Sequence, residues 1–326
     1  MIAAHELSKA TREGNVNSTF SFKGILKTIT PFLGLIILFL IFAVSTDGKF
    51  LTVTNLRTIA VQSFITMVAG IGATFTLAHG NLDFSLGGEL AICGIVGYFA
   101  STVSPWLALP ATIITGVLCS SLIAVIHIYM RVPAFIAGLS IMFVGRGLAA
   151  SVNSITTMIS PVSFIKYDNI TFYLPVVLGL LIVAFIIFEY TKIGKFNKAI
   201  GSNQRAAELS GIPVNKYKII AFIITGTTLG IAAFMTMIRA GGVGSTTGTG
   251  LEVEVLIAMV LGGMSISGGS SSKIRSIIIG ALIFMMMGNG LVLWKVNPNW
   301  VNTIRGIIFL AMVFLTFDRS RGQTAT

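Results

Sequence analysis

The chain has 326 residues, of which 54% are hydrophobic and only 10% are charged. A water-soluble domain carries about 25% charged residues, so a soluble chain of this length would need many more charges to cover its surface. The composition excludes disordered, collagen-like and nucleic-acid-binding proteins. Together with a mean hydropathy of +0.91, it predicts an integral membrane protein.

Ten apolar segments qualify as spans, because a spanning helix needs about 20 mostly apolar residues. They favour an all-α protein over a barrel, since residues 178–188 lack the alternation of a barrel strand. The first segment is short and ends in Ala43-Val44-Ser45, so a cleaved signal peptide is its alternative. The predicted spans are 31–44 (extending back toward Thr28), 57–78, 86–103, 106–130, 134–152, 173–190, 219–239, 251–266, 276–294 and 300–317.

The net charge of +11 is explained by membrane topology, because Lys and Arg gather in cytoplasmic loops. With ten spans and a cytoplasmic N-terminus, fifteen basic residues fall inside and five outside, while Arg146 and Arg305 lie within spans. This bias predicts that both termini are cytoplasmic. The expected organisation is a polar tail at 1–27, a membrane domain at 28–318 with a cytoplasmic loop at 191–218, and a tail at 319–326.

Two Gly- and Ser-rich stretches, 79–89 and 261–272, interrupt the apolar pattern on the predicted cytoplasmic side. Irregular backbone at membrane depth must be buried in protein or line a cavity, so broken helices in transporters often flank a pathway. Changing Gly263 to Leu is expected to block helix approach near the second break. The pathway candidates from the two breaks are Asn81, Asp83, Ser85, Gly87, Gly88, Gly262, Gly263 and Ser265.

Charges in or beside the spans are few. Asp83 and Ser85 are expected to cap the third span, with Glu89 in its first turn, where the helix dipole favours a negative charge. Arg146 lies within the fifth span and needs a carboxylate or carbonyl partner, which the sequence does not identify. The other charges of this kind are Glu252, Glu254 and Arg305; the two glutamates begin the eighth span in the same manner as Glu89.

The sequence contains no phosphate-binding loop, zinc-protease helix, paired-cysteine motif or nucleophile elbow. Cys93 and Cys119 lie inside apolar runs and are expected to be packed core residues. His127 is either a packed or interfacial histidine or a proton relay. We therefore expect no enzymatic activity, cofactor or metal, and the scarce charges argue against the alternative of an ion-coupled secondary carrier.

The polar loop between the sixth and seventh spans contains a helix signal. Residues 203–209 predict two helical turns with Asn203 as the cap, and the Gly-Ile-Pro sequence at 211–213 ends them. The small side chains of Ala206 and Ala207 permit close approach by another protein, so Ala207→Glu is expected to uncouple transport. The alternative is an ordinary amphipathic connector.

Four stretches in order resemble the permease subunit of bacterial ABC importers for monosaccharides, the ribose-type branch. They are 80–88, 132–136 with 145–147, 206–212, and 248–250 leading to 260–269. The resemblance covers residues from about 50 to 318 and implies the ABC importer permease fold in the bacterial inner membrane. It maps the family's ATPase-coupling helix onto 203–212, whose residues include Asn203, Ala206, Ala207, Glu208, Leu209, Ser210, Gly211 and Ile212.

The resemblance also implies partners: ATPase subunits on the cytoplasmic side, a secreted or lipid-anchored sugar-binding protein, and a second permease chain, identical or related. Transport would follow alternating access. His79 and Asn81 lie where the family has small or aliphatic residues, Glu89 replaces an apolar residue, and 270–272 replaces a Gly/Lys-rich stretch. The solute is therefore open, with a sugar-derived signal molecule or a nucleoside as the alternative to a monosaccharide.

Overall fold

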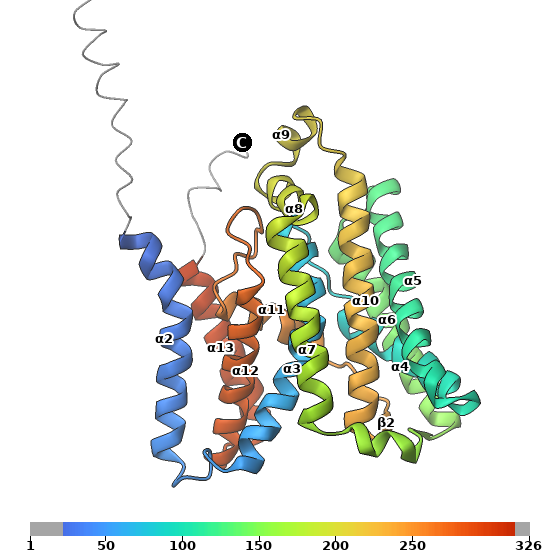
Figure 1. Cartoon of the computed structure of the whole chain (residues 1–326), viewed down its shortest axis with the longest axis vertical. Coiled ribbons are helices and arrows are strands. Elements are labelled where there is room, and N and C mark those ends of the chain that lie inside the picture. Colours follow the sequence, from blue (N-terminus) through green and yellow to red (C-terminus); the bar gives the residue numbers. More distant parts are fainter. Residues whose placement is uncertain (1–21, 317–326) are drawn as a thin grey trace, which may run out of the picture.

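A computed structural model describes residues 22–316. The predicted tail at 319–326 and residues 1–21 of the predicted tail at 1–27 lie outside this range, whereas residues 22–27 of that tail form the start of a helix. Most of the long helices lie side by side and run in roughly the same direction, and the short helices α8 and α9 lie at one end of this bundle (Figure 1). The first half contains α2 (Phe22–Ser45), α3 (Val53–Ala78), α4 (Leu86–Val103), η1 (Pro105–Leu107), α5 (Ala108–Tyr129), α6 (Ala134–Ile155), β1 (Met158–Ile159) and η2 (Val162–Tyr167). The second half contains α7 (Ile170–Phe185), η3 (Ile186–Tyr190), α8 (Lys192–Ser202), α9 (Gln204–Leu209), α10 (Val214–Ala240), β2 (Gly242–Val243), α11 (Leu251–Leu261), α12 (Arg275–Leu293) and α13 (Pro298–Thr316).

Each of the ten predicted spans coincides with a helix, and within the described residues 7 helices are long and apolar enough to cross a membrane. The prediction of a span over 251–266 is wrong in its extent. Helix α11 has 11 residues and ends at Leu261, where Gly262 and Gly263 follow. At about 1.5 Å per residue it reaches only about half of a bilayer's hydrocarbon core.

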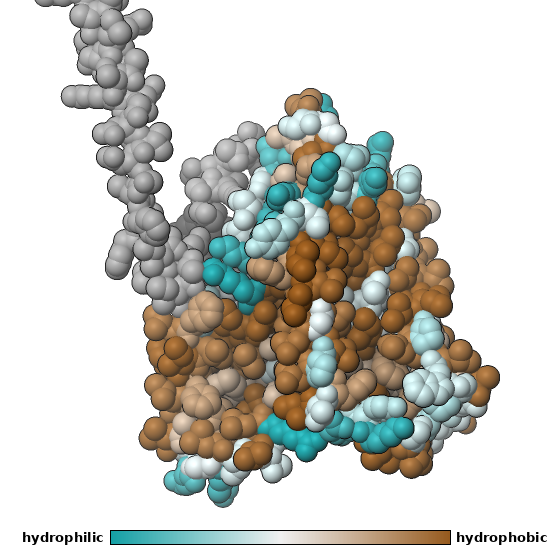
Figure 2. All heavy atoms as spheres, viewed as in Figure 1, coloured by the Kyte–Doolittle hydropathy of each residue, from teal (hydrophilic) through white to brown (hydrophobic). Residues whose placement is uncertain are grey.

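Apolar side chains cover the middle of the visible face, and hydrophilic ones gather toward the α8–α9 end and along the opposite rim (Figure 2). Large apolar residues remain exposed on the outer helices, including Leu118 on α5 and Ile182 on α7. A soluble protein would bury such surface, whereas lipid accepts it without cost. The chain is therefore a multi-pass membrane protein.

Glycines allow the central helices to approach closely. The Cβ that Gly116 of α5 lacks would collide with the carbonyl oxygen of Gly226 on α10, and one on Gly230 would collide with the α5 backbone at Thr112 and Ile113. The Gly226/Gly230 pair, spaced four residues apart, therefore packs α10 against α5. The hydroxyl groups of Thr residues on these helices donate to their own backbone carbonyls, as Thr225 does to Ala221 at 3.0 Å.

Helix α2 is packed into the membrane domain. Phe42 is buried, and its ring fills the space that Gly290 of α12 leaves open. Trp294, at the end of α12, stacks on Phe42 with a centroid distance of 4.9 Å and donates its indole N–H to the Ser45 hydroxyl at 2.9 Å. These contacts favour a retained first helix over a cleaved signal peptide.

Candidate functional site

The short helix predicted in the polar loop is present as α9. Asn203 caps it, since its side-chain oxygen accepts the N–H of Ala206 at 3.0 Å. Gly211 ends it with a φ of +78°, a conformation that glycine adopts without strain. Both local predictions are confirmed. Helix α9 stands at the end of the molecule where α8 and α10 meet it (Figure 1).

The surface of α9 differs from the prediction at one residue. Ala206, Leu209 and Ser210 are exposed, and the Leu209 side chain is 77% exposed. Ala207 is only 5% exposed, because it packs with Ile200 of α8 and Val214 of α10. The expectation that Ala207 contacts another protein is wrong: its Cβ faces the loop's own core, and it joins α9 to its two neighbours instead.

A chain of hydrogen bonds leads from α9 into the protein. Gln204 donates to Glu208 at 2.9 Å and accepts from the Lys218 ammonium group at 3.0 Å. Lys218, on α10, lies 3.4 Å from Nε2 of His127 on α5, and the amide nitrogen of Asn81 lies 2.8 Å from the same Nε2. We call Gln204, Lys218, His127 and Asn81 the polar chain.

Nε2 of His127 can accept hydrogen bonds from both Asn81 and Lys218. Its Nδ1 lies 2.8 Å from the Val132 carbonyl oxygen, which only accepts hydrogen bonds, so Nδ1 carries the proton. Nε2 of the neutral imidazole is then an acceptor facing Asn81 and Lys218. A packed or interfacial histidine, as opposed to a proton relay, is sufficient to explain these contacts.

The two glycine-rich breaks meet beside α8. The N–H of Gly269 donates to the carbonyl of Ala78 at 2.9 Å, and a Cβ on Gly268 would collide with the carbonyl of Leu77. Ser202, the last residue of α8, accepts the N–H of Ser270 at 3.0 Å through its hydroxyl. The residues that make this junction, 77–80 and 267–270, adjoin the predicted candidates rather than coincide with them.

Four predicted pathway residues lie at the start of α4: Asp83 and Ser85 just before the helix, and Gly87 and Gly88 in its first turn. Asp83 accepts the N–H of Ser85 at 2.8 Å, but Ser85 does not cap α4 with its side chain, which corrects the prediction. Its hydroxyl instead donates to the Glu89 carboxylate at 3.2 Å, which Ser120 of α5 also contacts, at 2.7 Å. Glu89 is therefore fully enclosed by hydroxyl donors from two helices.

Gly87 and Gly88 act as close contacts. A Cβ on Gly87 would collide with the carbonyl of Gly248 and with the Glu252 carboxylate, and one on Gly88 would collide with the backbone of Met142 on α6. In turn, a Cβ on Gly145, also on α6, would collide with the backbone of Gly88. Here helices α4 and α6 approach each other as closely as their backbones permit.

Arg146 has the partner that the sequence left open. Its guanidinium group forms an ion pair with the carboxylate of Glu252 on α11 at 2.5 Å. Glu252 is 5% exposed and one of its oxygens, Oε2, is buried without a hydrogen-bond partner among the described residues, as is Oδ2 of Asp83. The pair thus fixes α6 to the first turn of α11 and leaves acceptor oxygens free.

A small cavity lies next to this ion pair. It is lined by residues of α3, the first break and α11, and its volume of about 10 Å³ holds about one water molecule. A cavity of this size has no room for a molecule much larger than water. The polar residues in its lining are Thr76, Asn81, Asp83 and Glu252.

The second break contributes packing rather than polar groups. Gly262 meets the carbonyl of Ser276, where α12 begins, and Gly263 has a φ of +87° and faces Pro31 of α2. The Ser265 hydroxyl accepts the N–H of Ser267 at 3.3 Å within the break. Gly262 is therefore the residue that governs helix approach, whereas Gly263 provides the left-handed turn, which refines the expectation for Gly263→Leu.

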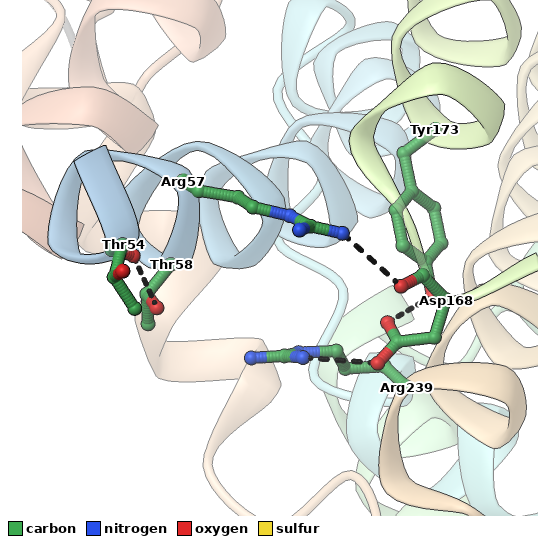
Figure 3. Close-up of polar contacts among 6 residues, drawn as sticks. All are labelled: Thr54, Arg57, Thr58, Asp168, Tyr173 and Arg239. Carbon is green, nitrogen blue, oxygen red and sulfur yellow. Dashed lines mark hydrogen bonds and ion pairs between the residues drawn. The ribbon is translucent and has the colours of Figure 1, made fainter. Parts of the chain in front are cut away.

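A second polar cluster, centred on Asp168, lies at the end of the helices opposite α9. Figure 3 shows Asp168 between the guanidinium groups of Arg57 on α3 and Arg239 on α10. Arg239 pairs with the carboxylate at 3.2 Å, Tyr173 donates to it at 3.0 Å, and Arg57 reaches the Asp168 carbonyl at 3.5 Å. The cluster ties three helices together at this end.

Sequence reasoning missed the polar chain and a polar stripe on α3, which consists of Asn55, Thr58, Gln62 and Thr66. The stripe is visible in the sequence as polar residues spaced by three or four on an apolar helix, a spacing that places them on one face. The contacts of the polar chain join residues up to 91 positions apart and leave no local signal. Within the described residues, no group of three or more His, Cys, Asp or Glu is arranged to hold a metal ion.

The long apolar helices and the exposed apolar surface define a multi-pass membrane protein. Residues 55–313 match the family described as branched-chain amino acid transport system / permease component, and the chain belongs to this family. No solved structure matches the chain.

The curated relatives that the chain resembles are sugar permeases of similar length. The ribose import permease protein RbsC of Escherichia coli K12 is 31% identical over 86% of this chain and 91% of the relative. The L-arabinose permease AraH of the same strain is also 31% identical, over 94% of each chain. The D-allose permease AlsC, again from that strain, is 29% identical over 94% of this chain and 97% of the relative.

Proposed function

We propose that this chain is the membrane permease subunit of an ATP-driven importer that moves a monosaccharide into a bacterial cell. The observation that carries the proposal is the set of relatives, which transport ribose, allose and arabinose and match nearly the whole chain. A binding protein outside the inner membrane delivers the sugar, and a second permease copy completes the passage.

The α8–α9 end is assigned to the cytoplasm, with both termini. The supporting observation is the concentration of basic residues there: Lys192, Lys195, Arg205 and Lys216 are exposed around α8, α9 and the start of α10. Lys and Arg are retained on the cytoplasmic side during insertion. This orientation points α9 toward the compartment that supplies ATP.

Helix α9 is assigned as the surface that receives an ATPase subunit. Its exposed apolar residue, Leu209, offers a contact that water disfavours, and the neighbouring Ala206 and Ser210 are small enough for close approach. Movement of α9 reaches α8 and α10 through Ala207, and it reaches the first break through the polar chain. Asn81, at the end of that chain, lines the small cavity.

Alternating access follows from these connections. When ATP binding draws the two ATPase subunits together, the α9 helices move with them, and α8 transmits this movement to the junction of the breaks. The cavity beside Arg146 and Glu252 then opens to one side of the membrane at a time. The residues assigned to this passage are Asn81, Asp83, Ser85, Gly87, Gly88, Gly262, Gly263, Ser265 and Arg146.

Uptake into vesicles tests the proposal. The chain is reconstituted with its candidate ATPase and sugar-binding protein, and uptake of radiolabelled sugars is measured with an active and with a hydrolysis-deficient ATPase. Uptake should require hydrolysis. Uptake that persists without hydrolysis and is abolished by an uncoupler would instead identify an ion-coupled carrier.

A further inference from the structure

Four polar residues form a stripe along one face of the apolar helix α3: Asn55, Thr58, Gln62 and Thr66. Their spacing of three and four residues aligns them on the helix surface. Thr58 already satisfies its own hydroxyl proton by donating to the Thr54 carbonyl at 3.0 Å, as Figure 3 shows, so its oxygen remains free to accept. The Gln62 side chain is exposed.

The stripe faces a cavity between α3, α12 and α13. The cavity has a volume of about 380 Å³, within the range of about 300–1,000 Å³ that holds small ligands. We call it the amide cavity, because most of its polar groups are side-chain amides. Its lining residues are Thr58, Gln62, Met285, Gly288, Asn289, Val292, Val301, Asn302 and Arg305.

The polar groups of this cavity are held in place. Asn289 and Asn55 exchange two hydrogen bonds, at 2.7 and 3.0 Å, which fixes both amide planes. The Arg305 guanidinium group stacks over the ring of Phe284 at 4.2 Å and is attracted to the Glu254 carboxylate, which Thr66 also contacts. Apart from Arg305, the polar groups in the cavity lining are the uncharged amides of Gln62, Asn289 and Asn302 and the hydroxyl of Thr58, so the cavity presents a mainly neutral, hydrogen-bonding surface.

Lipid is a poor neighbour for this surface. Gln62 and Asn302 are both exposed on transmembrane helices, and Nε of Arg305 is buried without a partner among the described residues. Amide and guanidinium groups facing hydrocarbon cost several kcal/mol, and such residues line water-filled cavities or substrate paths. The cavity therefore belongs to an aqueous route rather than to the lipid-facing surface.

The position of the cavity fits an entry site. It lies beside the first turns of α3 and α13 and the last turns of α12, whereas the opposite end of α3, at Ala78, contacts α8. Resting on the proposed function, we infer that the amide cavity binds the transported solute on the side where it enters, and that the solute is a neutral, polyhydroxylated molecule of monosaccharide size. Primary amides both donate and accept, which matches hydroxyl groups that do the same.

Transport kinetics provide the first test. Gln62→Ala and Asn302→Ala are compared with Asn153→Ala, a control on α6 whose amide bonds only its own helix, to Ala149 at 2.8 Å. In vesicles containing the whole importer, each cavity variant should raise the KM for uptake about 2- to 10-fold, the loss expected for one hydrogen bond. Stimulation of ATP hydrolysis by the sugar-loaded binding protein should stay unchanged. Unchanged KM in both cavity variants would overturn the inference.

Thiol labelling provides a second test that needs no transport. Gln62→Cys and Asn302→Cys are made after Cys93 and Cys119 are changed to alanine, and they are exposed to a membrane-impermeant maleimide. Both thiols should react, and at least one of D-ribose, D-allose, D-xylose or L-arabinose should slow the reaction. Reaction with lipid-soluble reagents alone, no reaction at all, or no protection by any of these sugars would overturn the inference. Absent uptake by the unmodified importer would instead contradict the proposed function.

Discussion

The ammonium group of Lys218 donates a hydrogen bond to the side-chain oxygen of Gln204, 3.0 Å away. Lys218 belongs to the long helix α10 and is only 7% exposed, whereas Gln204 is the first residue of the exposed helix α9. The same ammonium group lies beside His127, which contacts Asn81. These contacts join α9 to Asn81 in the first glycine-rich break through side chains as well as through the backbone.

Lys218→Met tests this connection. Methionine keeps the apolar length of lysine but removes every donor, so Gln204 and His127 lose their common partner. We expect ATP hydrolysis stimulated by the loaded binding protein to continue while sugar uptake per ATP falls several-fold. The ratio of uptake to hydrolysis in the same vesicles is the measurement. Lys216→Met, at an exposed position two residues earlier, is the control and should keep the normal ratio.

Two substitutions in α9 should separate assembly from folding, because one should weaken binding of the ATPase subunit and the other should destabilise the permease itself. Leu209→Glu changes a side chain that is 77% exposed, so the Tm of the isolated permease should not change while binding of the ATPase subunit weakens. Ala207→Glu forces a charge between Ile200 and Val214 and should lower the Tm, because an unpaired charge is costly to bury. Co-purification and thermal unfolding distinguish the two effects. Normal assembly of Leu209→Glu with the ATPase would show that α9 is not the docking surface.

Two glycines on α6 form a matched pair for stability. A Cβ at Gly145 would collide with the Gly88 backbone, whereas a Cβ at Gly147 meets nothing within 4 Å. Gly145→Ala should reduce the free energy of unfolding by about 1–3 kcal/mol, as overpacking does. Gly147→Ala should be neutral or slightly stabilising, because alanine favours helix. Denaturant titration in detergent measures both, and equal stability of the two variants would contradict the close approach of α4 and α6.

Stability should fall in acid because of His79. Burial, and after it the positive charge of Lys218, lowers the pKa of His79 from 6.5 to about 3. Below about pH 6.5 the unfolded chain therefore binds a proton that the folded protein does not bind. As the pH falls, the free energy of unfolding decreases by up to about 1.4 kcal/mol per pH unit. Replacing His79 with leucine should flatten this slope between about pH 6.5 and about pH 5. Parallel slopes for the two proteins in thermal unfolding would contradict the assignment.

Long-range pairs mark the limit of the sequence prediction. Most of the long apolar helices were predictable because lipid demands long apolar runs, and α9 was predictable because its cap and stop are local signals. Arg146 clearly needed a partner, but Glu252 is 106 residues away, and it comes within reach only because α4 packs against both α11 and α6. The inward orientation of Ala207 likewise depends on how α9 rotates onto Ile200, which no local pattern records.

Cross-linking from α9 tests the central claim most directly, namely that this chain takes its driving force from an ATPase through this helix. A cysteine at Leu209 and a control cysteine at Lys166, near the Asp168 cluster, are introduced into the assembled importer with both native cysteines changed to alanine. A bifunctional reagent that forms a disulfide with the cysteine thiol, releasing its thiol leaving group, and an amide with a lysine of the neighbouring protein supplies the link. We predict that position 209 cross-links to the ATPase subunit, that the link blocks uptake, and that reduction of its disulfide restores uptake. Cross-linking of the ATPase to position 166 instead, or full uptake with position 209 cross-linked, would contradict the account.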